Sequence, residues 1–365
     1  VHSDPDFDFD GFLSHPLTGQ RAGYSYIRDA EVQVYLDPDL QKLHKSVSKV
    51  LPGTHNRITS ASRDLRKLLI VSSDAREPGG LFIWDRDAGS VEPFGWFNEN
   101  LDPELLANMQ PVEYESDDGT RIPAYLTLPS GREPSGLPAV VMPHGGPESR
   151  TDQSYWFLTQ FLASRGYAVL EPNFRGSTGY GYDFKNAGRG QWGGLMQDDV
   201  DAGVRWLAEQ GYADPQRICI VGWSYGGYSA AMGLVKSPQL YRCGVGINGV
   251  YNLPALIAYD KQYIGGSTWV RHIGLDGEST RSVSPYHLAD EFQAPFLIVH
   301  AEDDATVNID QATGMHEKLL DAGAASDLVT VSLGGHSMRN RTARERILTE
   351  LERFLSSHIG GSQDD

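Results

Sequence analysis

The amino-acid sequence predicts a protein of the α/β class, built on a mostly parallel, doubly wound sheet. Short, uninterrupted apolar runs recur along the chain, as expected of strands that are buried on both faces. These runs lead into loops rich in glycine and polar residues, and such loops carry the ligand sites of parallel sheets. One run, 218–221, is followed at once by a turn and by an Ala- and Met-containing helix over 229–235.

The turn after residues 218–221 has the sequence Gly222-Trp223-Ser224-Tyr225-Gly226, with a glycine two residues before and two residues after the serine. This is the nucleophile-elbow pattern of serine hydrolases. Larger side chains at the glycine positions would collide with the adjoining strand and helix, and backbone strain holds the hydroxyl out at the top of the sheet. A serine that merely caps a helix is the alternative, but the order of strand, turn and helix favours a nucleophile.

Two further strands predict the partners of Ser224. The run 295–300 leads into Ala301-Glu302-Asp303-Asp304, and the run 328–333 leads into Gly334-Gly335-His336 before a final amphipathic helix over 343–355. The chain order Ser, Asp, His is the order that α/β-hydrolases use. We therefore expect an α/β-hydrolase catalytic domain over residues 111–360, with Ser224, Asp304 and His336 as its triad.

A loop further upstream is suited to stabilise an oxyanion. The strand candidate 139–142 opens into Pro143-His144-Gly145-Gly146-Pro147. In this fold one backbone N–H follows the nucleophile, here Tyr225, and another comes from the loop after the third strand. We expect Gly146 to supply that second donor; a proline-bounded turn without a catalytic role is the alternative.

Together with further motifs, these segments resemble the prolyl oligopeptidase family of serine peptidases, most closely its acylaminoacyl-peptidase-like branch. The resemblance covers roughly 220 residues in several ordered motifs. It implies a C-terminal hydrolase domain, an N-terminal β-propeller, and a register that places the triad acid on Asp304 and not on Asp303. The chain departs from the family pattern at Ala301, usually glycine, and at Asn308, often proline. The further motifs are Asn173 to Gly181, Gly193-Gly194, Met196 and Asp198-Asp199.

The residues ahead of the hydrolase domain are too few for a whole propeller, because one blade takes roughly 40 residues. Residues 58–62, 67–73, 80–86 and 90–94 predict the four strands of one blade; residues 12–36 hold two or three more strands, and residues 40–50 have helical spacing. We therefore expect residues 1–110 to be an incomplete β-propeller remnant of about one and a half blades plus a linker. Its exposed strand edges would be covered by a missing N-terminal propeller portion or by self-association into a homo-oligomer.

The resemblance favours a serine peptidase that cleaves peptide or N-acyl-aminoacyl amide bonds through an acyl-enzyme. A carboxylesterase acting on small acyl esters is the alternative, since the triad serves both reactions. A non-catalytic binding protein with a hydrolase fold is a further alternative. The candidates for substrate binding are three aromatic residues and one arginine: Trp223, Tyr228, Trp269 and Arg150.

Composition excludes other classes of partner. The formal charge of −17 and the lack of Lys/Arg clusters argue against nucleic acid, and no apolar run reaches the roughly 18 residues of a membrane span. The sequence begins at Val1 without a signal-like segment, which leaves a cytoplasmic or an exported location open. We expect Cys219 and Cys243 to be free, buried cysteines; a disulfide between them is the alternative. The residue spacing of a metal site is absent, so we expect neither a metal nor a cofactor.

Overall fold

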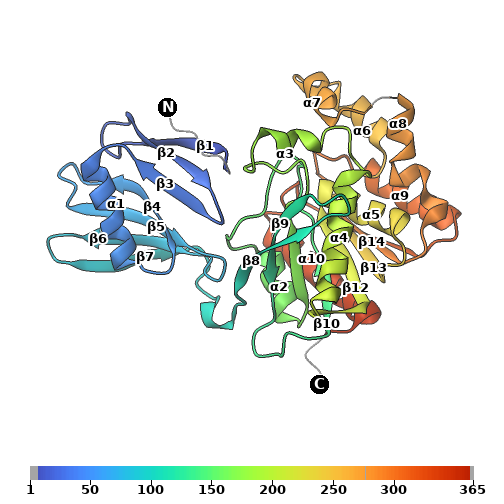
Figure 1. Cartoon of the computed structure of the whole chain (residues 1–365), viewed down its shortest axis with the longest axis horizontal. Helices are drawn as coiled ribbons and strands as arrows, with labels where there is room; N and C mark the ends of the chain where they lie inside the picture. Colours follow the sequence, from blue (N-terminus) through green and yellow to red (C-terminus); the bar gives the residue numbers. More distant parts are fainter. Residues whose placement is uncertain (1–6, 276, 362–365) are drawn as a thin grey trace. The chain divides into compact units, whose positions relative to one another are not determined.

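The computed structural model describes residues 7–275 and 277–361, which divide into two compact units (Figure 1). The first unit comprises the chain up to Gln110 with Asp152–Gln160 and Gly179–Gly181, and the second comprises the remainder.

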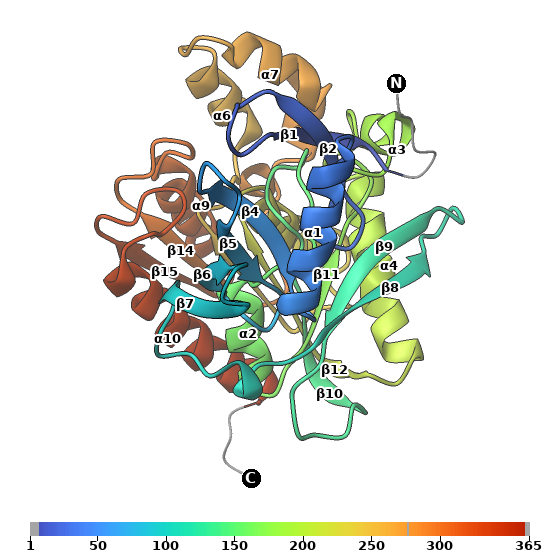
Figure 2. The ribbon, with the colours of Figure 1, turned by 90° about the vertical axis from the view of Figure 1, so that its left-hand side faces the viewer.

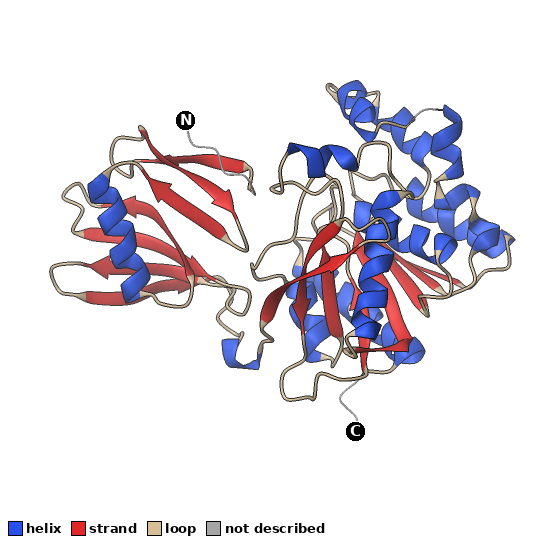
Figure 3. Cartoon of the chain, in the orientation of Figure 1, coloured by secondary structure: helices blue, strands red, loops and turns tan. Residues whose placement is uncertain are grey.

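The first unit is built mainly from strands, which form two separate sheets (Figure 3). Three strands form one antiparallel sheet in the order β1-β2-β3, and four form a second antiparallel sheet in the order β4-β5-β6-β7. The strands lie close to the ranges that the sequence predicts. Their bounds are β1 Phe9–Ser14, β2 Arg21–Ile27, β3 Glu31–Tyr35, β4 His55–Ala61, β5 Lys67–Ser73, β6 Gly80–Asp85 and β7 Ser90–Trp96.

Helix α1, Pro38–Val50, completes the core of this unit. It begins where the Asp37 carboxylate accepts hydrogen bonds from two backbone N–H groups of the first turn, and proline occupies the first helical position. Leu40, Leu43 and Val47 recur at helical spacing and are buried against the strands. A short 3₁₀ helix, Pro103–Leu105, follows the second sheet.

The second unit contains a mixed sheet of eight strands in the order β15-β14-β13-β12-β10-β11-β9-β8. Strands β10 to β15 are parallel to one another, and β9 pairs with β11 in the antiparallel direction. Strands β10, β11, β13 and β14 are buried along their whole length, as apolar runs covered on both faces should be. The bounds are β8 Met109–Glu115, β9 Arg121–Thr127, β10 Leu137–Val141, β11 Ala168–Pro172, β12 Ala213–Trp223, β13 Cys243–Ile247, β14 Phe296–Ala301 and β15 Ser326–Val331.

Helices cover both faces of this sheet, with α2 and α10 on one face and α4 on the other (Figure 2). Helices α6, α7 and α8 gather in one group, drawn in orange in Figure 1. This arrangement confirms the expected α/β-hydrolase fold. The bounds are α2 Phe157–Ser164, α3 Tyr182–Ala187, α4 Leu195–Glu209, α5 Tyr225–Lys236, α6 Leu253–Asp260, α7 Gly266–Ile273, α8 Gly277–Ser282, α9 Asp310–Asp321 and α10 Arg341–Ile359, with 3₁₀ turns at Pro285–His287 and Ala289–Glu291.

The expectation of free cysteines is wrong: Cys219 and Cys243 form a disulfide. The two residues are direct register partners on the adjacent parallel strands β12 and β13, with Cα atoms 4.8 Å apart. This separation lies within the range that a disulfide requires. Sequence alone does not reveal strand neighbours, and so it does not bring the two thiols together.

Among the residues that the structure describes, no helix is long and apolar enough to cross a membrane.

Candidate active site

The loop between β12 and α5 holds Ser224 in a strained backbone conformation. Its φ of 59° and ψ of −118° are unusual for a residue other than glycine. A Cβ atom on Gly222 would overlap the backbone of Gly226, and one on Gly226 would overlap the carbonyl of Pro143. The two glycines therefore meet the steric requirement of a sharp strand-to-helix turn. The Ser224 N–H donates to the Ile247 carbonyl at 2.9 Å, which ties the turn to the end of β13.

The loop after β14 brings an acid to the histidine loop. Asp304 Oδ2 lies 2.7 Å from His336 Nδ1. The other oxygen, Oδ1, accepts the backbone N–H groups of Thr306 at 2.8 Å and Val307 at 2.9 Å. Burial raises the pKa of Asp304, but the hydrogen bonds from His336, Val307 and Thr306 outweigh burial, and the net pKa lies below the usual value. Asp304 is therefore an ionised, fully hydrogen-bonded partner for the imidazole.

Its neighbour Asp303 has a different environment. The side chain is exposed, and Oδ1 accepts the Gly335 N–H at 2.8 Å. Asp303 thus binds the backbone of the histidine loop, whereas Asp304 binds the imidazole.

His300, near the end of β14, bonds the backbone of the loop that carries Asp304. It is fully buried, and its Nε2 lies 2.9 Å from the Val307 carbonyl and 3.8 Å from the Asp304 carboxylate. Burial lowers its pKa, so the imidazole stays neutral and Nε2–H donates to the Val307 carbonyl. This contact holds the turn that contains Asp304.

The loop after β10 lies directly against the serine. A Cβ atom on Gly145 would be 3.3 Å from Ser224 Cβ, so this glycine allows close approach. Gly146 follows with a φ of 125° and a cis bond to Pro147. Tyr225, the other expected donor, is the first residue of α5, and its side chain is buried.

His144 ties the loop after β10 to the loop after β11. Its ring stacks on Phe174 at 4.4 Å between centroids, Nδ1 lies 2.7 Å from the Gly145 carbonyl, and Nε2 lies 2.8 Å from Ser177 Oγ. Burial lowers the pKa of His144 to about 4, so the ring is neutral at neutral pH. The Ser177 hydroxyl also lies 2.7 Å from the Phe174 carbonyl, so His144, Ser177 and the two carbonyls form one hydrogen-bonded group.

Two of the other residues shared with the resembled family, Arg175 and Asp199, form a buried ion pair. Two guanidinium nitrogens of Arg175 lie 2.6–3.1 Å from the Asp199 carboxylate, which also accepts the Ser116 hydroxyl at 2.6 Å. Arg175 also pairs with Asp118. Arg175 follows β11 and Asp199 lies on α4, so the pair joins a loop at the functional edge of the sheet to a covering helix.

The structure places the four residues expected to bind substrate in different surroundings. Tyr228 is fully buried, with its hydroxyl bonded to the Val283 carbonyl at 2.8 Å and its ring packed on Trp192, so it belongs to the core. Trp223 is half-buried, and its Nε1 donates to the His336 carbonyl at 2.8 Å. Half-buried Arg150 donates from Nε to the neighbouring Thr151 carbonyl at 3.4 Å. Trp269 falls in α7, but its side chain lies outside the described part of the chain.

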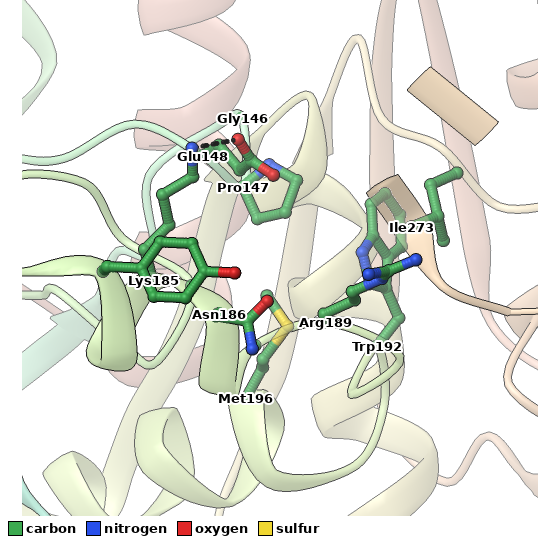
Figure 4. A pocket seen from close by; sticks show the side chains of 12 residues that line it. Gly146, Pro147, Glu148, Lys185, Asn186, Arg189, Trp192, Met196 and Ile273 are labelled. Atoms are coloured by element: carbon green, nitrogen blue, oxygen red, sulfur yellow. Dashed lines mark ion pairs between the residues drawn. The ribbon is translucent and has the colours of Figure 1, made fainter. Parts of the chain in front are cut away.

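A pocket of about 420 Å³ adjoins the loop after β10 at Gly146 (Figure 4). Trp192, Met196 and Ile273 supply apolar walls, and Glu148 and Lys185 form an ion pair of 2.8 Å at one side. Among the described residues, no group of three or more His, Cys, Asp or Glu side chains is placed to hold a metal ion. The lining also includes Gly146, Pro147, Gly176, Tyr182, Asn186, Gly188 and Arg189.

Sequence reasoning overlooked Asn248, the residue that follows β13. It is fully buried and has a φ of 47°. Its amide nitrogen donates to the carbonyls of Gly335 at 3.1 Å and His336 at 3.0 Å, and its amide oxygen accepts the Ala301 N–H at 2.8 Å. A polar residue followed by glycine at the end of the apolar run 243–247 was the available clue.

Comparison with known proteins finds relatives that are peptidases by name. The chain is 31% identical to dipeptidyl aminopeptidase BIII of Pseudoxanthomonas mexicana over 99% of this chain and 54% of that protein. It is 28% identical to dipeptidyl peptidase family member 6 of Caenorhabditis elegans over 91% of this chain and 50% of that protein. The chain thus spans about half the length of these curated relatives.

Solved structures show the same fold. A puromycin-hydrolyzing peptidase of Mycobacterium tuberculosis superposes with a TM-score of 0.80 at 22% identity, covering 97% of this chain and 54% of that one. An acylaminoacyl peptidase of Pyrococcus horikoshii gives a TM-score of 0.75 at 21% identity, covering 94% and 55%. The model of the family described as "Prolyl oligopeptidase family" matches residues 153–362. With the serine turn, the acid loop and the histidine loop all inside the matched region, the chain belongs to the prolyl oligopeptidase family of serine peptidases.

Proposed function

We propose that this chain cleaves peptide or N-acyl-aminoacyl amide bonds, with Ser224 as nucleophile, His336 as general base and Asp304 as the acid that orients it. The observation that carries the proposal is the 2.7 Å contact between Asp304 and His336 Nδ1. Trp223, which precedes the serine in its strained turn, donates to the His336 carbonyl. A proton on Nδ1 leaves Nε2 free to accept the Ser224 proton. Membership of the family supports the same roles.

The reaction then proceeds in two steps. Ser224 Oγ attacks the carbonyl carbon, its proton passes to His336 Nε2, and that proton is delivered to the leaving amine as the C–N bond breaks. Water, deprotonated by the same imidazole, then hydrolyses the acyl-enzyme. We assign the two oxyanion donors to the N–H groups of Tyr225 and Gly146, which the elbow and the adjoining glycine loop support.

We also propose that the pocket beside Gly146 receives the side chain of the residue that donates the acyl group. Its walls of Trp192, Met196 and Ile273 suit an apolar side chain. The names of the relatives suggest two substrate classes, dipeptidyl and acyl-aminoacyl compounds. In both classes an amino-acid side chain lies next to the scissile carbonyl.

For residues 1–110 we propose an incomplete β-propeller. The four-stranded antiparallel sheet β4–β7 has the strand number and order of one blade, and β1–β3 supply part of another. The half-length coverage of the relatives supports this proposal. The unpaired edge strands of an incomplete propeller would be covered by further blades or by a second copy of the chain.

Labelling with a fluorophosphonate tests the catalytic proposal. We expect one adduct per chain, located on Ser224, together with hydrolysis of dipeptidyl and N-acyl-aminoacyl anilides. Ser224→Ala should lose both the adduct and the hydrolysis, and Ser357→Ala, an exposed serine on α10, should lose neither. An adduct that persists in Ser224→Ala, or hydrolysis that persists there, would overturn the proposal.

A further inference from the structure

The backbone of the histidine loop is held by two side chains that converge on one carbonyl group. The His336 carbonyl accepts both Trp223 Nε1 at 2.8 Å and Asn248 Nδ2 at 3.0 Å. Asn248 Nδ2 also donates to the Gly335 carbonyl at 3.1 Å. Two donors on a single carbonyl fix the position of the residue that carries the imidazole.

The loop is anchored at one end by Met338, which is fully buried and whose carbonyl accepts Arg344 Nε at 2.9 Å, but its backbone is strained. Leu333 and Met338 both have positive φ values, 55° and 45°, on either side of the histidine. Leu333 is 73% exposed and therefore does not anchor the loop by packing. Backbone conformations of this kind persist only where surrounding contacts impose them.

Asn248 reaches the acid side of the site as well. Its amide oxygen accepts the N–H of Ala301, three residues before Asp304, while its own N–H donates to the Val299 carbonyl at 2.9 Å. An amide is well suited to this position because it offers an acceptor and two donors, and asparagine tolerates the left-handed backbone found here.

The serine is joined to the same point. Ile247, the residue before Asn248, accepts the Ser224 N–H, and Trp223 immediately precedes the serine. Residues 247–248 and Trp223 therefore contact the segments that carry all three members of the proposed triad.

We infer that Trp223 and Asn248 are positioning residues that set the imidazole of His336 relative to Ser224 and Asp304. The inference rests on the proposed catalytic roles. Their effect is on the transition state, because a displacement of about 1 Å in a reacting group can cost roughly 10²-fold in rate without weakening substrate binding. Trp223 thus acts through the histidine and not as a wall of the substrate site.

Steady-state kinetics on one N-acyl-aminoacyl anilide test this inference. Trp223→Phe removes the N–H donor and replaces the indole with a smaller ring; it should lower kcat about tenfold, with KM unchanged. Asn248→Ala should lower kcat by roughly 10- to 100-fold. Asn248→Asp keeps an acceptor for Ala301 but places an oxygen against two carbonyls, so it should resemble Asn248→Ala. In the double variant the two losses should not multiply, because both donors serve one carbonyl.

Two matched controls separate positioning from folding. Trp206→Phe alters a partly buried tryptophan of α4, and Asn56→Ala removes a buried asparagine whose amide bonds the Leu51 carbonyl in the first unit. Both should leave kcat unchanged, whatever they do to thermal stability.

The outcomes are distinct. A raised KM with unchanged kcat in Trp223→Phe would make Trp223 a substrate contact and overturn the inference. Unchanged kcat with a lowered melting temperature in Trp223→Phe and Asn248→Asp would show purely structural contacts and also overturn it. If Asn248→Ala does not fold, the other two variants decide. Failure of the proposed function itself would appear separately, as absence of the Ser224 adduct in the unmodified chain.

Discussion

Asp303 and Asp304 differ in what their carboxylates can accept, although they are neighbours in one loop. Both lie in the turn that follows the end of β14 at Ala301. Asp304 points inward to the imidazole, and Asp303 stays exposed and binds the Gly335 N–H.

The acid can therefore be assigned by substitution. Asp304→Asn should cost on the order of 10⁴ in kcat because the histidine tautomer would be wrong, a figure taken from another serine protease. Asp303→Asn should cost within about tenfold, the range of an ordinary loop change. The measurement is kcat of both variants on one ester substrate, with folding checked by circular dichroism. A large loss of kcat in Asp303→Asn with near-normal kcat in Asp304→Asn would show that Asp303, and not Asp304, is the triad acid.

His144 makes stability depend on pH. Its pKa is about 4 in the folded chain and near 6.5 when unfolded, so the unfolded chain binds more protons between these values. The neutral His144 therefore contributes roughly 3 kcal/mol to the free energy of unfolding above about pH 6.5. This contribution falls as the pH drops and is lost near pH 4.

Urea unfolding of His144→Gln between pH 4 and pH 7 checks this. The variant should lose part of the slope of stability against pH, and His55→Gln, which changes an exposed histidine, should keep it. Equal slopes in His144→Gln and the unmodified chain would contradict a neutral His144 in the folded chain.

At the scale of secondary-structure elements, the buried ion pair links the loop after β11 to helix α4. Arg175 is 5% exposed and Asp199 is fully buried. Burial raises the pKa of Asp199, and the hydrogen bonds from Arg175 and Ser116 oppose that rise. Removing only the arginine would leave an uncompensated buried carboxylate.

We therefore expect Arg175→Met to lower the free energy of unfolding by about 3–5 kcal/mol, whereas the double variant Arg175→Met/Asp199→Leu should lose less. Arg341→Met, which removes an exposed pair with Glu345, should hardly move the urea midpoint. A double variant less stable than Arg175→Met would contradict the prediction.

The disulfide between β12 and β13 joins residues 24 apart in sequence. Closing a loop of this length in the unfolded chain stabilises the fold by about 3 kcal/mol in the chain-entropy model. Thiol titration in denaturant should find no free thiol without reductant and two after reduction. Replacing both cysteines with alanine should lower stability by a similar amount. Two reactive thiols in the unreduced chain would show that the bond does not form.

At the scale of the whole molecule, the described strands of the first unit are too few to close a ring. A propeller needs four to eight four-stranded blades, and only seven strands are present among the described residues of this unit.

Assayed as this chain, the protein should therefore cleave unfolded casein as well as short chromogenic peptides. The products would be followed by mass spectrometry, with Ser224→Ala as the control. Rapid cleavage of short substrates with casein wholly untouched would mean that the site is covered by other means.

The sequence by itself determined what local patterns encode. The glycine spacing around Ser224 and the buried apolar runs that end at Asp304 and His336 depend on steric and hydrophobic rules that act within a few residues. For this reason the hydrolase fold, the strands of the first unit and the members of the proposed triad could be predicted without coordinates.

Only the tertiary structure decided which distant residues meet. Asp304 and His336 are 32 residues apart and Asn248 and His336 are 88 apart, and their contacts depend on the order of strands in the sheet. The same order pairs Cys219 with Cys243, and packing of the core buries Tyr228. A sequence pattern fixes the face of a strand on which a side chain lies; its neighbour across the sheet is set by the free energy of packing the whole chain.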